Sequence, residues 1–143
     1  MRKLLITLLL LCFSLPAMAS ISKQQTQNIF NQLVNANGIN AQLSFTSGAE
    51  INAYGGRGHV FITKGMLKWA DMNVMIYVLS HELGHATGHL SELGADKVSG
   101  RIGNKAGMNV CPGAKKFLLG IGLESGDGIH PRGDVRLKAM CSL

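Results

Sequence analysis

The residues from His81 to His85, in the order His-Glu-Leu-Gly-His, have the types and spacing of a metal site. Two histidines four positions apart share one face of a helix, with side chains about 6 Å apart, so both imidazoles can bind one zinc ion. Glu82 would lie beside that ion without binding it, where its carboxylate can take a proton from an attacking water and pass it to a leaving amine. We therefore expect one Zn²⁺ ion at His81 and His85, with Glu82 as general base.

The third ligand must come from His89, Glu92 or Asp96. In a straight helix His89 would lie about 12 Å from His81 along the axis, too far for a shared ion, and Glu92 would lie farther still. The helix must therefore break, and Gly88 offers a place. If the chain reverses there, Glu92 returns to the zinc, and Asp96 can accept the free ring N–H of a ligating histidine. We expect the side chain of His89 to be solvated, although His89 or Asp96 could replace Glu92 as the third ligand. Manganese and cobalt are alternatives to zinc, but two histidines and a carboxylate suit zinc best.

Five helices are predicted around this motif. Apolar residues at intervals of three and four, together with capping residues, place them over 22–37, about 16 residues after Asp71, 92–106, 112–119, and from Pro131 to near Cys141. The helix after Asp71 should bury the stripe Met72, Met75, Ile76, Leu79 and Leu83. A loop is expected over 120–129, which contains four glycines.

Three short strands are predicted between the first two helices. Leu43 and Phe45 alternate with polar neighbours, Ile51 and Ala53 begin a second candidate, and the run 60–62 marks a third. The glycines at 55, 56 and 58 interrupt this region. A bulge, a hairpin tip or the close approach of another backbone would explain these glycines. A plain hairpin loop is the most common of these cases.

The first 19 residues have the pattern of a secretory signal peptide, with Arg2 and Lys3 before an apolar run from Leu4 to Phe13 and an Ala-x-Ala site ending at Ala19. Ten apolar residues fall short of the roughly 20 that a membrane-spanning helix needs, so we expect no stable span after signal removal. The predicted mature chain is one domain, 20–143, and we expect it in the periplasm or secreted. In that oxidising compartment Cys111 and Cys141 should form a disulfide.

Composition narrows the function classes. The 46% hydrophobic and 15% charged content of the 143 residues excludes a disordered polar chain and allows one core. Removing 1–19 takes away two of the 14 basic residues, which leaves 12 against 8 acidic residues and a net charge of +4. The basic residues are scattered, so a nucleic-acid partner is not indicated.

The paired segments His81–His85 and Glu92–Asp96 resemble the signature of the gluzincin metallopeptidases related to HtpX and the CAAX prenyl proteases, including the small soluble minigluzincins. The segment from Asn52 to Leu67 is similar to the one that supplies the family's edge strand. His130-Pro131, with an arginine six residues after the histidine, is similar to its His-Pro element. The resemblance covers roughly residues 50 to 140.

This resemblance implies an α+β, zincin-like fold with a small antiparallel or mixed sheet packed on the active-site helix and the helix after it. It implies that His81, His85 and Glu92 bind zinc and that Glu82 is the general base. It also implies that Asp96 orients a ligand and that His130 and Arg136 support the oxyanion. It also implies an edge strand near His59 to Ile62 that binds a polypeptide substrate by strand addition. The chain departs from the family in placing only six residues between His85 and Glu92. Either the intervening hairpin is trimmed to a minimal turn, or the ligand geometry is altered.

Three functions follow from these observations. The first is a zinc-dependent metalloendopeptidase that cleaves exported or misfolded proteins in the bacterial envelope by water-mediated attack. The alternative is a noncatalytic zinc-bound module that binds extended polypeptides as a chaperone does. The third is a structural secreted domain with accidental histidines, which would hold no stoichiometric zinc.

Overall fold

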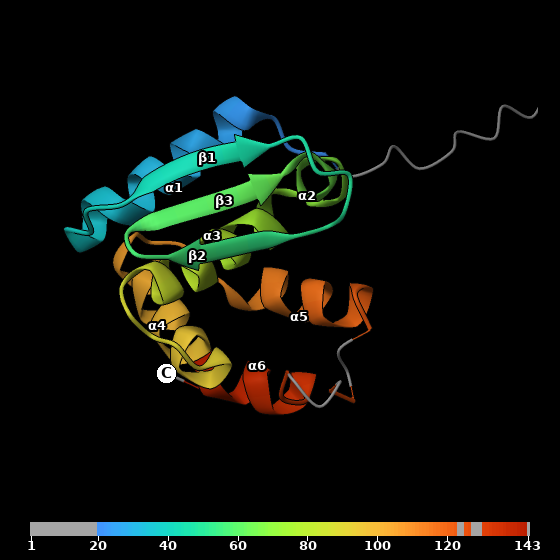
Figure 1. The fold of residues 1–143 in the computed structure, drawn as a ribbon. Coiled ribbons are helices and arrows are strands. Elements are labelled where there is room, and N and C mark those ends of the chain that lie inside the picture. The colour runs from blue at the N-terminus through green and yellow to red at the C-terminus, as the bar shows by residue number, and fades with distance from the viewer. Residues whose placement is uncertain (1–19, 123–124, 127–129, 143) are drawn as a thin grey trace, which may run out of the picture.

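A computed structural model describes residues 20–122, 125–126 and 130–142, so the predicted signal peptide lies outside the described residues. Within them the predicted α+β fold is confirmed, with six helices and one three-stranded mixed sheet (Figure 1). The elements in chain order are α1 (Lys23–Asn37), β1 (Gln42–Thr46), β2 (Ala53–Gly56), β3 (His59–Thr63), α2 (Lys64–Trp69), α3 (Met72–Ala86), α4 (Glu92–Lys105), α5 (Cys111–Gly120) and α6 (Gly133–Cys141).

Local capping chemistry explains where the predicted helices begin. Ser22, Asp71 and Ser91 precede α1, α3 and α4, and each side chain accepts a hydrogen bond from a backbone N–H three residues later. Gly38 ends α1 in the left-handed conformation, with φ of 65°. The six-residue α2 is too short to produce a periodic apolar pattern, and the sequence analysis did not predict it.

The sheet has the order β1-β3-β2, with β1 parallel and β2 antiparallel to β3. The prediction of an edge strand near His59 to Ile62 is therefore wrong, because these residues form the central strand. The edge nearer to α3 and to the lower helices is β2 (Figure 1). The pairing of β1 with β3 joins residues 17 positions apart and is a tertiary contact that strand patterning does not report.

Two of the proposed explanations for the glycines apply, each to different residues. A Cβ on Gly55 would lie 2.1 Å from the carbonyl oxygen of Glu82, so this glycine allows β2 to lie directly against α3. Gly58 belongs instead to the two-residue turn that joins β2 to β3. The close approach at Gly55 determines how near the sheet edge comes to the predicted metal site.

Helix α3 lies at the centre of the fold, between the sheet and the layer formed by α4, α5 and α6 (Figure 1). Because α3 is covered on both sides, Val74 and Val78 are as buried as Met75, Leu79 and Leu83 of the predicted stripe, whereas Ile76 is half-buried. Met72 is 52% exposed, contrary to the prediction, since it lies in the first turn of the helix. His81, which lies on α3, is buried as well, with 6% of its surface exposed.

The predicted disulfide is present between Cys111, at the start of α5, and Cys141, at the end of α6. It links α5 and α6, which belong to the layer of helices on the side of α3 away from the sheet (Figure 1). Among the described residues, no helix combines the length and the apolar character that crossing a membrane requires.

Candidate active site

A short reversal between α3 and α4 brings Glu92 back to the histidines. Gly88 has a φ of 103°, which favours glycine, and the side chain of Ser91 caps the new helix by accepting from the N–H of Gly94 at 3.1 Å. The helices cross closely, because a Cβ on Gly84 would lie only 3.0 Å from the Cα of Ala95. Six residues are therefore enough to connect His85 to Glu92.

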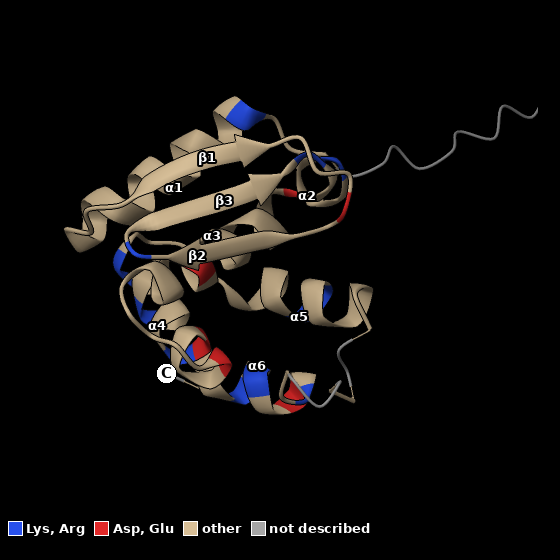
Figure 2. Cartoon of the chain, in the orientation of Figure 1, with Lys and Arg blue, Asp and Glu red and all other residues tan. Residues whose placement is uncertain are grey.

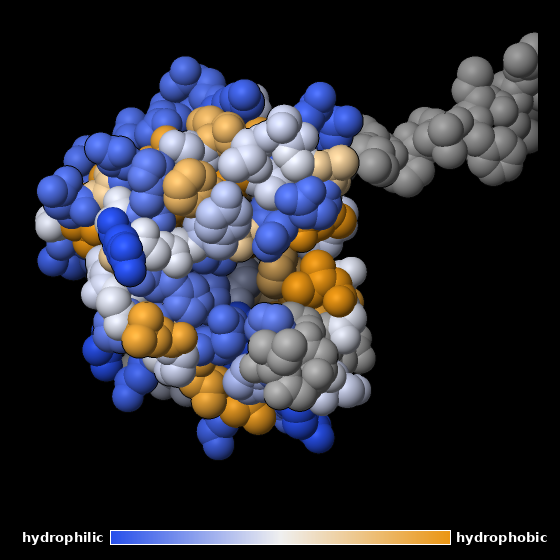
Figure 3. Space-filling view, viewed as in Figure 1, coloured by the Kyte–Doolittle hydropathy of each residue, from blue (hydrophilic) through white to orange (hydrophobic). Residues whose placement is uncertain are grey.

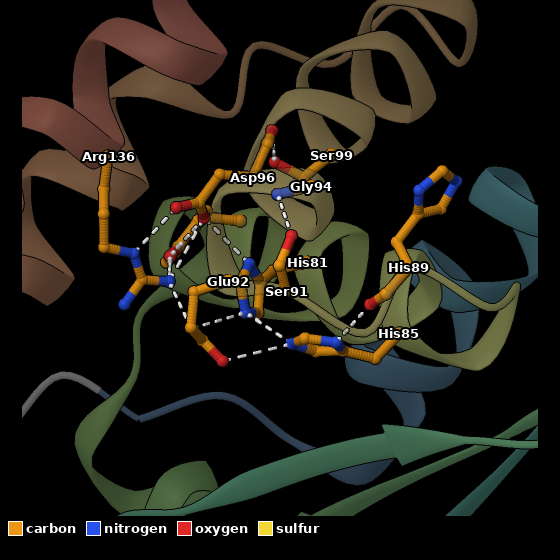
Figure 4. Close-up of polar contacts among 10 residues, drawn as sticks. His81, His85, His89, Ser91, Glu92, Gly94, Asp96, Ser99 and Arg136 are labelled. Atoms are coloured by element: carbon orange, nitrogen blue, oxygen red, sulfur yellow. Dashed lines mark hydrogen bonds and ion pairs between the residues drawn. The ribbon is translucent and has the colours of Figure 1, made fainter. Parts of the chain in front are cut away.

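The side chains of His81, His85 and Glu92 converge on one point (Figure 4), with one donor atom from each within 4.8 Å of the others. The two Nε2 atoms are 3.2 Å apart, and each lies 3.4 Å from a carboxylate oxygen of Glu92. In a tetrahedral zinc site, Zn–N and Zn–O distances of 2.0 to 2.2 Å separate neighbouring donors by about 3.3 Å. The donor types and spacings therefore fit three protein ligands of a zinc ion, which His81, His85 and Glu92 would supply.

The second nitrogen of each imidazole has an acceptor that fixes the ring. The Nδ1 of His81 lies 2.8 Å from Oδ1 of Asp96, and the Nδ1 of His85 lies 2.7 Å from the backbone carbonyl of His89. These contacts keep the proton on Nδ1 and leave the Nε2 lone pairs for a metal. Of the ligands left open, the structure places Glu92 in the cluster and Asp96 behind His81, whereas His89 contributes its carbonyl and has an exposed side chain.

Arg136 connects α6 to this cluster (Figure 4). Its guanidinium donates to both carboxylate oxygens of Asp96, at 2.7 and 3.1 Å, and lies 3.1 Å from Oε2 of Glu92. It also donates to the hydroxyl of Tyr77 at 2.9 Å. Arg136 is 2% exposed and Asp96 is fully buried, so water does not solvate their charges. Each charge is instead stabilised by its partners in the network, and removal of one partner would leave an unpaired buried charge. The predicted role of Arg136 in supporting an oxyanion stays a prediction.

Tyr77 was missed by the sequence analysis. It lies one turn before His81 on α3, is 1% exposed, and donates to Asp96 Oδ1 at 3.3 Å. Burial raises the pKa of its hydroxyl well above the usual value, which keeps it a neutral donor. Its position four residues before a candidate ligand was the available signal, because residues at that spacing lie on one helix face.

The charges of the site suit a divalent cation. Glu82, Glu92, Asp96 and Arg136 have a formal net charge of −2 when both histidines are neutral. Burial alone would lower the pKa of His81, but hydrogen bonds with Asp96 and Glu92 raise it to about 9. Hydrogen bonds from His81 and His85 lower the pKa of Glu92 in turn. The carboxylates thus hold a proton on His81, which a metal ion would displace.

Glu82 lies beside the ligands and faces the sheet edge. The backbone N–H of Gly55 hydrogen-bonds to its carboxylate, and burial raises the pKa of Glu82 above the usual value. A carboxylate with a raised pKa is a better proton acceptor near neutral pH. The structure therefore places Glu82 between the metal ligands and β2, where a substrate backbone could reach it.

A cleft of about 520 Å³ opens at this point. Its polar half is formed by the ligands, Glu82, Arg136 and His130. Its other half is apolar and is lined by Ile51, Met66, Val78, Phe117 and Ile121. Figure 3 shows the hollow below the sheet, hydrophilic in the middle and bordered by hydrophobic residues. His130 lines the cleft as predicted, while its part in stabilising an oxyanion stays a prediction.

An α+β domain of this kind has a His-Glu-Leu-Gly-His helix, and the next helix offers a carboxylate as the third candidate ligand. These features are typical of the zincin-like class of metallopeptidases. Comparison with models of protein families matches residues 20–91 to peptidase family M48, and the chain is a member of this family. Family M48 consists of zinc-dependent metallopeptidases, which are hydrolases. The matched segment contains His81, Glu82 and His85 and ends one residue before Glu92. No curated protein and no solved structure matches the chain.

Proposed function

We propose that this protein is a zinc-dependent endopeptidase that cleaves extended, apolar segments of exported or misfolded proteins. The observation that carries the proposal is the convergence of His81, His85 and Glu92 beside Glu82, directly below the free edge of β2. Family membership supports the reaction class. The cleft and the sheet edge support the substrate.

The residues of the chain divide the reaction between them. A bound zinc ion would lower the pKa of water and polarise a substrate carbonyl. Glu82 accepts the proton of the attacking water and later donates it to the leaving amine. His130, which lines the same cleft, supplies an imidazole donor for the charge that develops on the carbonyl oxygen.

The edge strand β2 is the proposed seat of the substrate backbone. The carbonyl of Asn52 accepts from the N–H of Thr63 at 3.2 Å, so by strand alternation the backbone groups of Ala53 and Gly55 point away from β3. The Ala53 N–H donates to the Asn52 side chain at 2.9 Å, and the Gly55 N–H is bonded to Glu82. The N–H groups of an extended substrate would donate to the carbonyls of Ala53 and Gly55. The substrate's own carbonyls would replace the side chains of Asn52 and Glu82 as acceptors of the two N–H groups.

The apolar half of the cleft favours hydrophobic substrate side chains. Val78 lies one turn before Glu82 on α3, so this pocket is adjacent to the reacting position. Hydrophobic side chains are buried in folded proteins and become accessible when proteins misfold. The leader pattern of residues 1–19, together with the Cys111–Cys141 disulfide, supports a periplasmic or secreted location for this activity.

Replacement of Glu82 by glutamine tests the proposal, because it preserves shape and removes the base. We expect zinc-loaded wild-type protein to cleave an unfolded polypeptide, a chelator to stop cleavage, and Glu82→Gln to lower the rate by about 10²-fold to 10⁴-fold. Glu82→Gln should keep one zinc per chain, measured by metal analysis after dialysis. Glu50→Gln, at an exposed glutamate, is the matched control and should cleave like wild type.

Equal behaviour of wild type and Glu82→Gln would contradict the enzyme function. If neither cleaves while both bind zinc and hold an unfolded polypeptide in solution, the noncatalytic binding module is the correct function. If neither binds zinc, both functions fail.

A further inference from the structure

A second hollow, a groove of about 690 Å³, lies between the β2–β3 turn and the loop after α3. Gly55 and His85 line both this groove and the cleft at the metal ligands, so the two hollows adjoin each other beside β2. Four of the residues that line the groove are glycines, at positions 55, 56, 58 and 88. Its lining is thus rich in glycine and carries one residue with a permanent formal charge, Arg57.

Arg57 occupies a backbone position that disfavours it. Arg57 and Gly58 form the two-residue turn between β2 and β3, with φ angles of 49° and 74°. Asparagine, aspartate or glycine are the usual residues at the first position of such a turn, because positive φ strains other residues. Arg57 is the one non-glycine residue with positive φ in the described part of the chain. Strain of this kind commonly accompanies a functional role.

The turn that carries Arg57 is held in place from two sides. The N–H of Gly58 donates to the carbonyl of Ala86 at 3.0 Å, one residue after the ligand His85. The carbonyl of Gly58 accepts from the N–H of Gln42 at 2.9 Å. Arg57 is therefore presented at a fixed place relative to the metal site, and Figure 2 shows a basic segment, coloured blue, at the turn between β2 and β3.

The guanidinium of Arg57 is available for a ligand. The residue is exposed, and across the described residues its side chain has no hydrogen-bond or ion-pair partner. The opposite side of the groove carries Leu90, which is 92% exposed. A cation on one wall and an apolar side chain on the other suit a carboxylate carried on a short methylene stem.

We infer that Arg57 is a specificity-determining residue that binds a substrate carboxylate beyond the metal site. The inference rests on the proposed peptidase function. Arg57 follows Gly55, which faces Glu82, by two residues, or about 7 Å of extended chain. The preferred carboxylate therefore belongs to an Asp or Glu about two residues from the cleaved bond, on the side of that bond away from the apolar pocket.

Matched peptides test this directly. Each carries a bulky apolar residue for the pocket and Glu, Gln or Lys two residues before or after the cleaved bond. For one of the two placements, we expect kcat/KM for the Glu peptide to exceed that for the Lys peptide by about fivefold to tenfold at low salt, as for an exposed ion pair, and by less at roughly 0.5 M salt. Amidated and free-acid forms of the same peptides distinguish a side-chain carboxylate from a chain terminus.

Variants of Arg57 assign the preference. Arg57→Asn, which suits the turn, should reduce the Glu-to-Lys ratio to about one, Arg57→Lys should retain most of it, and Arg57→Glu should invert it. Arg101→Glu, at an exposed arginine on α4, is the control and should keep the wild-type ratio. An unchanged ratio in Arg57→Asn, or a lost ratio in Arg101→Glu, would overturn the inference.

Binding to zinc-loaded Glu82→Gln separates this inference from the proposed function. Fluorescence anisotropy with the same labelled peptides requires no cleavage, and the Glu peptide should bind about fivefold more tightly than the Lys peptide. Tighter binding of the Glu peptide without any cleavage by wild type would support Arg57 and sink the peptidase. Cleavage by wild type, with equal binding and equal rates for the Glu and Lys peptides, would support the peptidase and contradict the role of Arg57.

Discussion

At the scale of single residues, the site depends on the groups that hold the ligands as well as on the ligands. Asp96 is fully buried and bonds both His81 and Arg136. Burial would raise the pKa of Asp96, but the hydrogen bonds from these two partners outweigh it and lower that pKa. The carboxylate is thus kept ionised behind a ligand, where it holds the proton on the nitrogen that does not face the metal.

Replacement of Asp96 by asparagine should therefore weaken zinc binding. The amide retains the shape but loses the charge, and it can present an N–H where an acceptor is needed. Loss of such a contact typically costs 10-fold to 100-fold in metal affinity, and we expect about that. Competition with a chromophoric chelator measures the change. Asp134→Asn, at an exposed carboxylate on α6, should bind zinc like wild type, and an equal affinity in Asp96→Asn would contradict the assigned role.

At the scale of elements, the site depends on close contacts between backbones. Gly84 lets α4 cross α3, which returns Glu92 to the histidines, and Gly55 lets β2 lie on α3. The contact at Gly84 keeps α3 and α4 close enough to be joined by a short connection. The six-residue interval before Glu92 is therefore compatible with a converging ligand set.

Gly55→Ala should separate β2 from α3. The new methyl group would meet backbone atoms of Glu82, which cannot rotate away, so the strand must move. We expect the free energy of unfolding to fall by about 2 kcal/mol, as for overpacking in a well-packed core, measured by urea denaturation. The control is Gly56→Ala, where a Cβ meets nothing within 4 Å, and which should change that free energy by less than about 0.5 kcal/mol. Equal stability of the two variants would show that the contact at Gly55 is not limiting.

At the scale of the whole molecule, what could be predicted follows from how local each signal is. Helix starts at Ser22, Asp71 and Ser91 follow from capping chemistry within a few residues, and the sequence is sufficient for them. The place of β3 in the centre of the sheet was mispredicted because strand order depends on distant pairing. The contacts of Arg136 join residues 40 positions apart, which no local pattern reports.

The disulfide is expected to stabilise the fold and the metal site together. Cys111→Ser with Cys141→Ser opens a loop of 30 residues, which should lower the free energy of unfolding by about 3 to 4 kcal/mol. Zinc affinity should fall as well, because the bond fixes the end of α6, the helix that carries Arg136. Denaturation and chelator competition measure the two effects.

Reduction of the wild-type protein should reproduce the change in stability, and reoxidation should reverse it. An unchanged zinc affinity in the double variant would show that the network of Arg136 holds α6 without the covalent link. An unchanged stability would contradict the role of the disulfide.

The spacing of the site along the chain also fixes the order in which ribosomal synthesis completes it. His81, His85 and Glu92 lie within 12 consecutive residues, whereas Arg136 follows Glu92 by 44 residues. A growing chain thus carries every metal ligand, and Asp96, well before the guanidinium that neutralises them is made. A metal ion encountered at that stage would meet the full donor set with its carboxylates uncompensated. The charge-compensated site can therefore form only after the last helix has been made.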